Sequence, residues 1–156
     1  MENSDVFVRE ASSEDAIDVS RICQLGITEL RRVYRPQFGL TKQSSHKPMK
    51  RLVAITDGKV VGTVQCQLTA DRLHLIGLFV HPDYRFKGVA RGLVEKSIEI
   101  ARSTGINRLS LYTIEETGNV TIFERLGFTV VRRSVPLDME SVNGKPITEA
   151  YMERAF

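Results

Sequence analysis

The sequence contains few of the residues that mark several common classes of protein. It has only two cysteines in 156 residues, Cys23 and Cys66, and their spacing is not that of a metal site. A domain of this length needs no disulfide, so we expect both thiols to be reduced, buried and apolar in character. Eleven glycines and five prolines are too few for a collagen-like or disordered chain.

Long apolar segments and a signal peptide are also lacking. The longest apolar run, Leu75 to Val80, is far shorter than the roughly 18 residues that cross a bilayer. The acidic first residues differ from the basic start of a signal peptide. The sequence therefore predicts a cytoplasmic protein without a membrane-spanning segment.

Charge is nearly balanced over the whole chain but not along it. The net charge of +3 does not by itself indicate a nucleic-acid or membrane partner. Acidic residues are absent from the segment between positions 31 and 51, and this segment has few aromatic residues for stacking on bases, which disfavours nucleic acid. Its seven basic residues are Arg31, Arg32, Arg35, Lys42, Lys47, Lys50 and Arg51.

The length predicts one domain over residues 1–156, because it is close to the usual size of about 150 residues per domain. Hydrophobic periodicity then predicts the elements of this domain. We expect helices over 12–25, 27–34, 88–102 and 118–126, the first of them opened by a capping box of Ser12 and Asp15. A mobile loop is expected over 38–49. Strands are expected over 6–9, 52–55, 60–68, 73–80, 108–113, 128–137 and 147–154, with a hairpin turn at Asp57-Gly58.

This order of elements predicts an α+β fold with a central, mostly antiparallel mixed sheet flanked by helices. The strand–helix–strand unit over 73–113 requires one parallel pair with a right-handed crossover. The apolar end of the strand over 73–80 predicts that both of its faces are covered. We expect the strand over 147–154 to lie at a sheet edge, where a second copy could pair to form a homodimer.

A loop that leads from a buried strand into a helix is the most informative segment. It comprises the residues from Val80 to Gly88, after which the predicted helix begins. Backbone N–H groups and the positive end of the helix dipole attract an anion there, and Gly88 allows the ligand to approach the backbone. Arg85 and Lys87 add positive charge. The alternative is that Gly88 only closes a tight turn beside solvated cations.

In this order of elements, Arg85-x-x-Gly88-x-Ala90 resembles the acyl-CoA pyrophosphate loop of the GNAT N-acetyltransferase superfamily, Arg/Gln-x-x-Gly-x-Gly/Ala. The segment from Ile122 to Phe128 resembles the family's aromatic-Glu-Lys/Arg-x-Gly-Phe motif. The opening strand and helix, which include Val8-Arg9-Glu10-Ala11, are also similar to those of the family. The resemblance covers nearly the whole chain and implies the GNAT acyl-CoA N-acyltransferase fold with acetyl-CoA as the cofactor.

The resemblance also implies where the coenzyme would lie. The pantetheine arm would pair with the end of the strand over 73–80, and the pyrophosphate would lie against the loop over 85–90. Glu116 stands where the family often has a cofactor-contacting Asn, and the nearby Asn119 is a substitute candidate. The cofactor-binding candidates are Leu78, Phe79, Val80, Arg85, Phe86, Lys87, Gly88, Val89, Ala90, Asn119 and Phe123.

Acetyl transfer to an amine needs a base for the amine and an acid for the thiolate. His74 stands where many family members have a catalytic Glu, and imidazole can act as a base near neutral pH. It could instead be a strand histidine that covers the core edge or faces solvent. Phe123 replaces the family's frequent proton-donating Tyr, so Tyr112 is the substitute acid, its alternative role being a packed strand aromatic.

These residues predict an acetyl-CoA-dependent N-acetyltransferase without a metal. It would act on a primary amine of a small molecule or peptide by direct attack in a ternary complex. The cationic segment over 31–51 would wall the acceptor site and favour an acidic acceptor, although these cations could face the coenzyme's 3′-phosphate or only water. Glu116 and Phe123 motivate the alternative, a non-catalytic acyl-CoA-binding or regulatory module.

Overall fold

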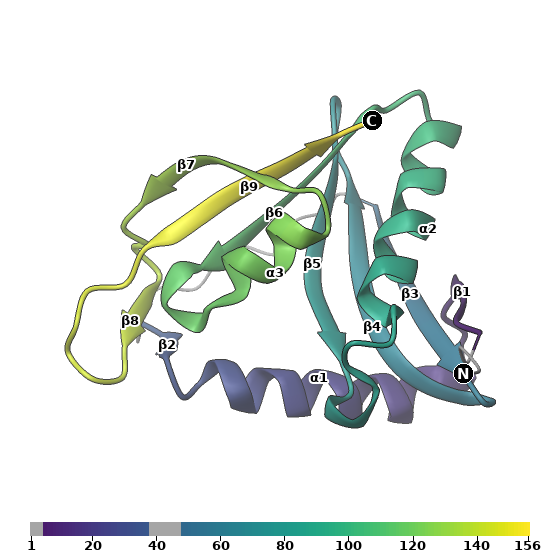
Figure 1. The fold of residues 1–156 in the computed structure, drawn as a ribbon, viewed down its shortest axis with the longest axis horizontal. Helices are drawn as coiled ribbons and strands as arrows, with labels where there is room; N and C mark the ends of the chain where they lie inside the picture. The colour runs from purple at the N-terminus through teal and green to yellow at the C-terminus, as the bar shows by residue number, and fades with distance from the viewer. Residues whose placement is uncertain (1–4, 38–47) are drawn as a thin grey trace.

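The fold is built on one seven-stranded sheet (Figure 1). The computed structural model describes residues 5–37 and 48–156, and the structural statements below concern these residues. Every neighbouring pair of strands is antiparallel except β5 and β6, which confirms the predicted α+β class with one parallel unit. In sheet order the strands are β1 (Phe7–Glu10), β3 (Met49–Thr56), β4 (Lys59–Leu68), β5 (Leu73–Val80), β6 (Arg108–Ile114), β9 (Glu149–Ala155) and β7 (Thr129–Ser134).

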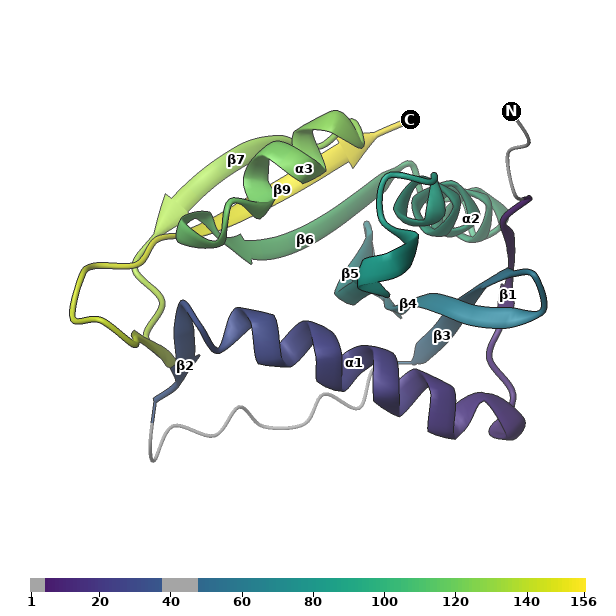
Figure 2. The same cartoon turned by 60° about the horizontal axis from the view of Figure 1, so that its bottom comes forward.

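Helices cover both faces of this sheet (Figure 2). Helix α1 (Ala16–Leu30) lies on one face, while α2 (Val89–Ser103) and α3 (Asn119–Arg125) lie on the other. Three 3₁₀ helices, η1 (Ser13–Asp15), η2 (Pro82–Tyr84) and η3 (Glu115–Thr117), each precede one of them in the chain. Apolar residues of α2 recur at helical spacing and are buried against the sheet: Val89, Leu93, Val94, Ile98 and Ala101.

Alternation along the strands decides which side chains reach the opposite face. In β5 and β6, leucines 73, 75, 109 and 111 belong to the core that packs against α2. Because successive side chains of a strand point to opposite faces, His74, Ser110 and Tyr112 project toward the face that carries α1. The core pattern of these two strands therefore places three polar side chains together on that face.

The parallel pairing of β5 with β6 stops early. The two strands are in register only at Leu73↔Leu109 and His74↔Ser110, and they diverge beyond this point (Figure 1). On its other side β5 stays paired with β4, with an irregularity near Gly77, whose φ is +63°. The end of β5 is consequently only partly covered, with Ile76 36% exposed, so the prediction that both faces are covered there was wrong.

A glycine lets α1 approach the diverging part of β5. Any side chain at Gly26 would overlap the ring of Phe79 in β5. The close approach of the helix to β5 therefore requires glycine at position 26, although glycine is a poor helix former. Contact with Phe79 holds α1 beside the end of β5 that does not pair with β6.

The segment after α1 differs from the prediction. The separate helix expected over 27–34 does not exist, since α1 itself runs to Leu30 and Tyr34–Pro36 forms strand β2. Strand β2 pairs with β8 (Met139–Ser141). The strand expected over 128–137 is β7, which ends at Ser134. This pairing joins residues about one hundred positions apart, which local periodicity does not reveal. Most of the predicted mobile loop, residues 38–47, lies outside the described residues, and Met49 already belongs to β3.

Three further expectations can be compared with the structure. The strand expected over 147–154 is β9, which lies between β6 and β7 and is not an edge, so that argument for a homodimer was wrong. Cys66 is buried as predicted, whereas Cys23 is only half-buried, and both are free thiols. Within the described ranges, the helices are too short or too polar to cross a membrane.

The predicted capping box is present before α1. Both carboxylate oxygens of Asp15 accept hydrogen bonds from the Arg9 guanidinium, at 2.7 and 3.0 Å, and one also accepts from the Ser12 N–H at 2.7 Å. The Arg9 hydrogen bond and then the Ser12 N–H lower the pKa of the nearly buried Asp15 from 3.8 to about 2. Strand β1 is thereby tied to the start of α1.

Asp15→Asn should destabilise the fold by about 1–2 kcal/mol at pH 7, because a charged acceptor is lost. The folded-state pKa of Asp15 lies below its unfolded value, so its contribution is complete above about pH 4 and disappears as the pH falls through about 2. Urea unfolding from pH 7 to 2 should show the difference from wild type narrowing. Asp18→Asn, at a half-exposed residue 3.5 Å from Arg21, is the control. A difference that stays constant across this range contradicts the assignment.

Candidate active site

The end of β5 offers an open backbone edge. Leu78, Phe79 and Val80 lie beyond the last pair with β6, while Phe79 and Val80 stay in register with β4. In the described structure, β6 therefore pairs with none of these three residues. An extended group that carries amides can hydrogen-bond to such an edge as an added strand would. These three sequence-predicted residues thus occupy a position suited to a pantetheine arm.

The loop after β5 has the backbone geometry of an anion site. Phe86 and Gly88 both have positive φ values, +62° and +83°, and α2 begins directly after Gly88. The Gly92 N–H donates to the Gly88 carbonyl at 2.9 Å and closes the first helical turn. The N–H groups of Val89, Ala90 and Arg91 precede this bond, so the helix itself provides them with no acceptor.

Space around Gly88 also suits a phosphate group. A Cβ built on Gly88 would meet no atom within 4 Å, so an anion can reach the backbone from this side. The positive end of the α2 dipole faces the same region. The loop over 85–90 is therefore suited to a phosphate group, and glycine is favoured at position 88 because of its left-handed conformation.

The cations of this loop are held by specific neighbours. Arg85 Nη2 lies 2.7 Å from Glu29 Oε1, which joins the loop to α1. Lys87 Nζ lies 5.3 Å from the centre of the Tyr84 ring. Sequence reasoning missed Glu29, because its partner lies 56 positions away and only the fold brings the two together.

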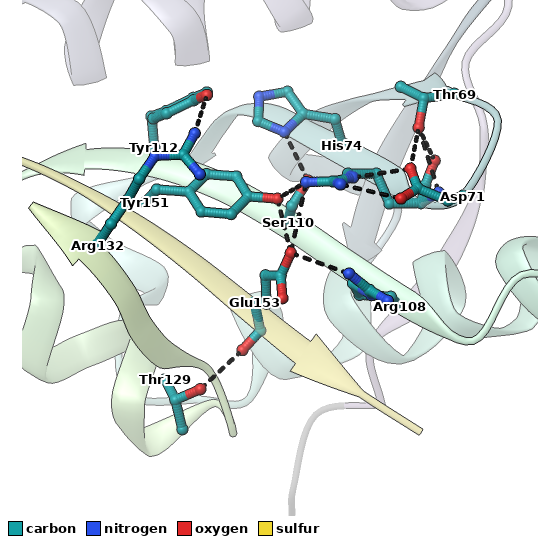
Figure 3. Close-up of polar contacts among 11 residues, drawn as sticks. Thr69, Asp71, His74, Arg108, Ser110, Tyr112, Thr129, Arg132, Tyr151 and Glu153 are labelled. Carbon is teal, nitrogen blue, oxygen red and sulfur yellow. Dashed lines mark hydrogen bonds and ion pairs between the residues drawn. The ribbon is translucent and has the colours of Figure 1, made fainter.

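His74 and Tyr112 come together where β5 and β6 separate (Figure 3). Their rings meet edge to face, with centroids 5.3 Å apart. His74 Nδ1 lies 2.8 Å from Ser110 Oγ on β6. The Tyr112 hydroxyl accepts a hydrogen bond from Arg132 at 3.3 Å, and its side chain is 47% exposed. The two residues selected from the sequence as base and acid are therefore neighbours at one partly accessible place.

The remaining cofactor candidates, Asn119 and Phe123, lie on α3. This helix lies on the same face of the sheet as α2 (Figures 1 and 2). Asn119 opens α3, and its N–H donates to Thr117 Oγ1 at 3.2 Å. Phe123 is half-buried and contacts Phe128 edge to face. The Glu116 carboxylate accepts from the Thr148 N–H at 2.6 Å, so this departure from the family pattern binds the segment before β9.

A polar cluster beneath His74 was missed in the sequence. The Tyr151 hydroxyl donates to Glu153 Oε2 at 2.8 Å and accepts from Arg72. Glu153 also lies 3.5 Å from Arg108. Burial, followed by the hydrogen bond to Glu153, raises the pKa of Tyr151, which keeps its proton at neutral pH. Tyr151 and Glu153 lie on β9, whereas Arg72 directly precedes β5 and Arg108 begins β6, so only the fold brings the cluster together.

The cationic segment over 31–51 is less uniform than its sequence suggests. Arg35 Nε lies 2.8 Å from Glu140 Oε1 on β8, and Arg51 donates to Thr63 Oγ1 at 3.0 Å. Arg31 and Arg32 are exposed, with the Arg31 guanidinium 5.4 Å from the centre of the Tyr34 ring. Lys42 and Lys47 lie outside the described residues. Strand pairing of β2 with β8 thus brings a carboxylate to a segment that has none of its own.

An open strand edge next to a helix N-terminus suits a ligand that carries both amides and phosphates, as an acyl-CoA does. Residues 19–128 match the sequence profile of the acetyltransferase (GNAT) family. The chain belongs to this family and is an N-acetyltransferase. Members of this family use acetyl-CoA, and membership of the family supports the enzyme rather than the non-catalytic alternative.

Comparison with individual proteins agrees with this assignment. An acetyltransferase of Pectobacterium atrosepticum is 27% identical over 124 residues, which cover 79% of this chain and 85% of that protein. The fold is similar to the ribosomal-protein-S18-alanine N-acetyltransferase of Escherichia coli, with a TM-score of 0.71, 17% identity and coverage of 97% and 94%. Nourseothricin acetyltransferase gives a TM-score of 0.70 at 20% identity, with coverage of 96% and 98%. A Bacillus anthracis protein described as a streptothricin acetyltransferase, in complex with acetyl coenzyme A, gives 0.71 at 14% identity, with 99% of both chains covered.

Gly88→Val should abolish the thermal stabilisation that acetyl-CoA gives the wild type. A coenzyme concentration of about 100 times Kd adds roughly 2.7 kcal/mol of stability, which shifts the unfolding midpoint by several degrees. The valine side chain would occupy the space required by the pyrophosphate. Thermal unfolding with and without acetyl-CoA measures the loss.

Gly105→Val is the matched control for this variant. Gly105 has a φ of +79°, its Cβ would also meet nothing within 4 Å, and it follows the other end of α2. Both variants suffer the same backbone strain, but only the change at Gly88 should remove the coenzyme shift. Equal shifts in the two variants would show that this loop does not hold the pyrophosphate.

Proposed function

We propose that this protein transfers an acetyl group from acetyl-CoA to a primary amine of a small molecule or peptide, by direct attack in a ternary complex. The observation that supports this mechanism is the contact of His74 with Tyr112 where β5 and β6 separate. Residues 1–156 would act as one catalytic domain, since the open edge, the loop and both side chains belong to one sheet and its connections.

The coenzyme would be bound chiefly by backbone groups. The exposed edge over 78–80 would pair with the pantetheine arm, and the N–H groups at the start of α2 would bind the pyrophosphate. Asn119 and Phe123 would contact the arm from the α3 side. When bound, acetyl-CoA supplies an acetyl thioester, whose carbon–sulfur bond breaks as the acceptor nitrogen bonds to the carbonyl carbon.

His74 would take the proton of the attacking amine. It stands at the last pair between β5 and β6, beside the open edge of β5. Its Nδ1 lies 2.8 Å from Ser110 Oγ, a contact that orients the imidazole ring. Proton removal makes the nitrogen nucleophilic and prevents a positive charge from remaining on the product amide.

Tyr112 would donate a proton to the leaving sulfur. Phe123 has no hydroxyl, whereas Tyr112 lies on the same face of the sheet as His74, contacts its ring and is partly exposed. The Arg132 guanidinium, 3.3 Å from this oxygen, would stabilise the negative charge left after donation. In each turnover His74 would gain one proton and Tyr112 would lose one. Proton exchange with solvent would then restore neutral His74 and protonated Tyr112.

His74→Ala should lower kcat by about 100-fold or more while acetyl-CoA still stabilises the protein thermally, because the base is lost and the coenzyme site is intact. Steady-state kinetics with free-thiol detection measures kcat. His74→Gln, which keeps a polar side chain without a base, should lose activity to a similar extent, and added imidazole should partly restore His74→Ala. Wild-type kcat in His74→Ala would remove this residue from the mechanism.

The acceptor would lie beyond β2, near the exposed part of the cationic segment. The names of two structural neighbours refer to nourseothricin and to a ribosomal-protein alanine, so this fold accommodates acceptors as different as a small molecule and a protein residue. Arg31 and Arg32 favour an acceptor that carries a negative charge besides its amine. Arg35 would add to this attraction only in part, because Glu140 neutralises it.

Neutralising Arg31, Arg32 and Arg35 together to Gln should raise the acceptor KM by about tenfold, with little change in the KM for acetyl-CoA. The reason is the loss of attraction for an acidic acceptor, and the effect should shrink at high salt. The readout is the pair of KM values at low and high ionic strength.

A control variant removes three exposed cations elsewhere and should leave both KM values unchanged. Its substitutions to Gln are at Arg21, Lys59 and Arg125. Equal acceptor kinetics in the two triple variants would refute an acidic acceptor while leaving the catalytic proposal intact.

A further inference from the structure

We propose that Arg132 binds a carboxylate of the acceptor, so that the protein acetylates amines that carry a carboxylate a few bonds away, as amino acids and short peptides do. The inference deepens the proposed function, and it rests on that function because it takes the opening between β5 and β6 as the place where the amine is acetylated. Arg132 would be a specificity-determining residue that contacts the acceptor. No sequence motif singles out this residue.

Arg132 lies in a row of three side chains that crosses neighbouring strands (Figure 3). Arg132 of β7 is in register with Tyr151 of β9, which is in register with Tyr112 of β6. Arg132 Nη2 lies 3.3 Å from the Tyr112 hydroxyl, and its Cζ lies 4.3 Å from the centre of the Tyr151 ring. The Tyr112 ring contacts the ring of His74. A group bound to Arg132 would therefore lie one aromatic side chain away from the proposed base.

The ring beneath Arg132 is firmly held. Tyr151 is 3% exposed, and its hydroxyl donates to Glu153 Oε2 at 2.8 Å and accepts from Arg72. Its ring also contacts that of Tyr112, with centroids 5.1 Å apart. A guanidinium has five N–H donors, and the hydrogen bond to Tyr112 uses one of them. Arg132 is thus fixed in position and still has donors for a ligand.

Arg132 has no carboxylate partner of its own. Arg133, the next residue on β7, pairs with Glu115. Within the part of the chain that the structure describes, the contacts of the Arg132 guanidinium are the Tyr112 hydroxyl and the Tyr151 ring. Residues 38–47, which lie outside that part, contain neither Asp nor Glu. An exposed cation that is held in place without a counter-ion is suited to an anionic ligand.

A carboxylate of the acceptor fits this position better than a phosphate of the coenzyme. Two carboxylate oxygens can accept from two N–H groups of one guanidinium. The coenzyme phosphates are expected at the loop before α2, which lies at the far end of β5, and α2 covers the opposite face of the sheet. Because only the Tyr112 ring separates Arg132 from His74, the amine and the carboxylate must be close together in the acceptor.

The first test compares acceptors that differ only in the carboxylate, namely single L-amino acids and their carboxamides. The measured quantity is the ratio of kcat/KM for the acid to kcat/KM for the amide. Arg132→Gln should lower this ratio about tenfold relative to the wild type, because a charge-assisted contact is lost only for the acid. A weaker effect on the Tyr112 oxygen would slow both acceptors equally and would cancel in the ratio.

Two further variants serve as controls. Arg133→Gln removes the same charge one residue away, from a guanidinium that has its own partner, and should keep the wild-type ratio. Arg132→Lys keeps the charge without the planar donor group and should retain part of the preference. The KM for acetyl-CoA should be unchanged in all three variants.

A binding measurement tests the same contact without turnover. N-acetylglycine carries an acetamide and a carboxylate, and N-acetylglycinamide lacks only the charge. In the presence of coenzyme A, N-acetylglycine should shift the NMR signals of the Tyr112 and Tyr151 rings, which can be assigned by substitution because the chain has four tyrosines. Its Kd should rise at least tenfold in Arg132→Gln and stay unchanged in Arg133→Gln.

The inference would be overturned by an acid-to-amide ratio in Arg132→Gln that equals the wild-type ratio, or by an equal fall of this ratio in Arg133→Gln. Equal binding of N-acetylglycine and its amide would also overturn it, and this measurement alone decides if none of the amino acids is acetylated. Wild-type kcat in His74→Ala would instead refute the proposed base and leave both tests of Arg132 valid. The two failures are therefore distinguishable.

Discussion

The early end of hydrogen bonding between β5 and β6 is the constraint on which the site depends. Two pairs hold the strands together, and beyond His74 they diverge. Divergence leaves one edge of β5 open for an extended ligand and places the loop before α2 at the far end of that edge. It also puts His74 and Tyr112 at the start of the opening, where an acceptor could reach the acyl group.

Maintaining this opening requires support on both sides of the sheet. On one face α1 approaches so closely at Gly26 that only glycine fits against Phe79. Glu29 of the same helix binds Arg85 and so couples α1 to the anion-binding loop. On the other side of the opening, β6 pairs with β9 from Arg108 to Ile114, and Arg108 of β6 also lies 3.5 Å from Glu153 of β9. The open edge is thus flanked by packed elements on both sides.

Much of the fold was predictable because its signals are local. The α2 periodicity, the Asp57-Gly58 turn and the capping box at Ser12 each involve residues within one or two turns of one another, and the structure confirms them. Strand β2 was mistaken for a helix because its partner β8 lies about one hundred positions away. The placement of β9 inside the sheet likewise depended on competition among strands for partners, which no local pattern records.

The sequence by itself determined the class of protein, since the Arg85-x-x-Gly88-x-Ala90 loop, the strand before it and the helix after it are contiguous and carry their own geometry. It also led to the prediction that His74 acts as the base and Tyr112 as the acid. Only the tertiary structure decided that His74 and Tyr112 touch, that Ser110 lies within hydrogen-bond distance of His74, and that Glu29 holds Arg85. The reason is physical: these contacts join different strands and helices, so they exist only after the sheet has paired and the helices have packed on it.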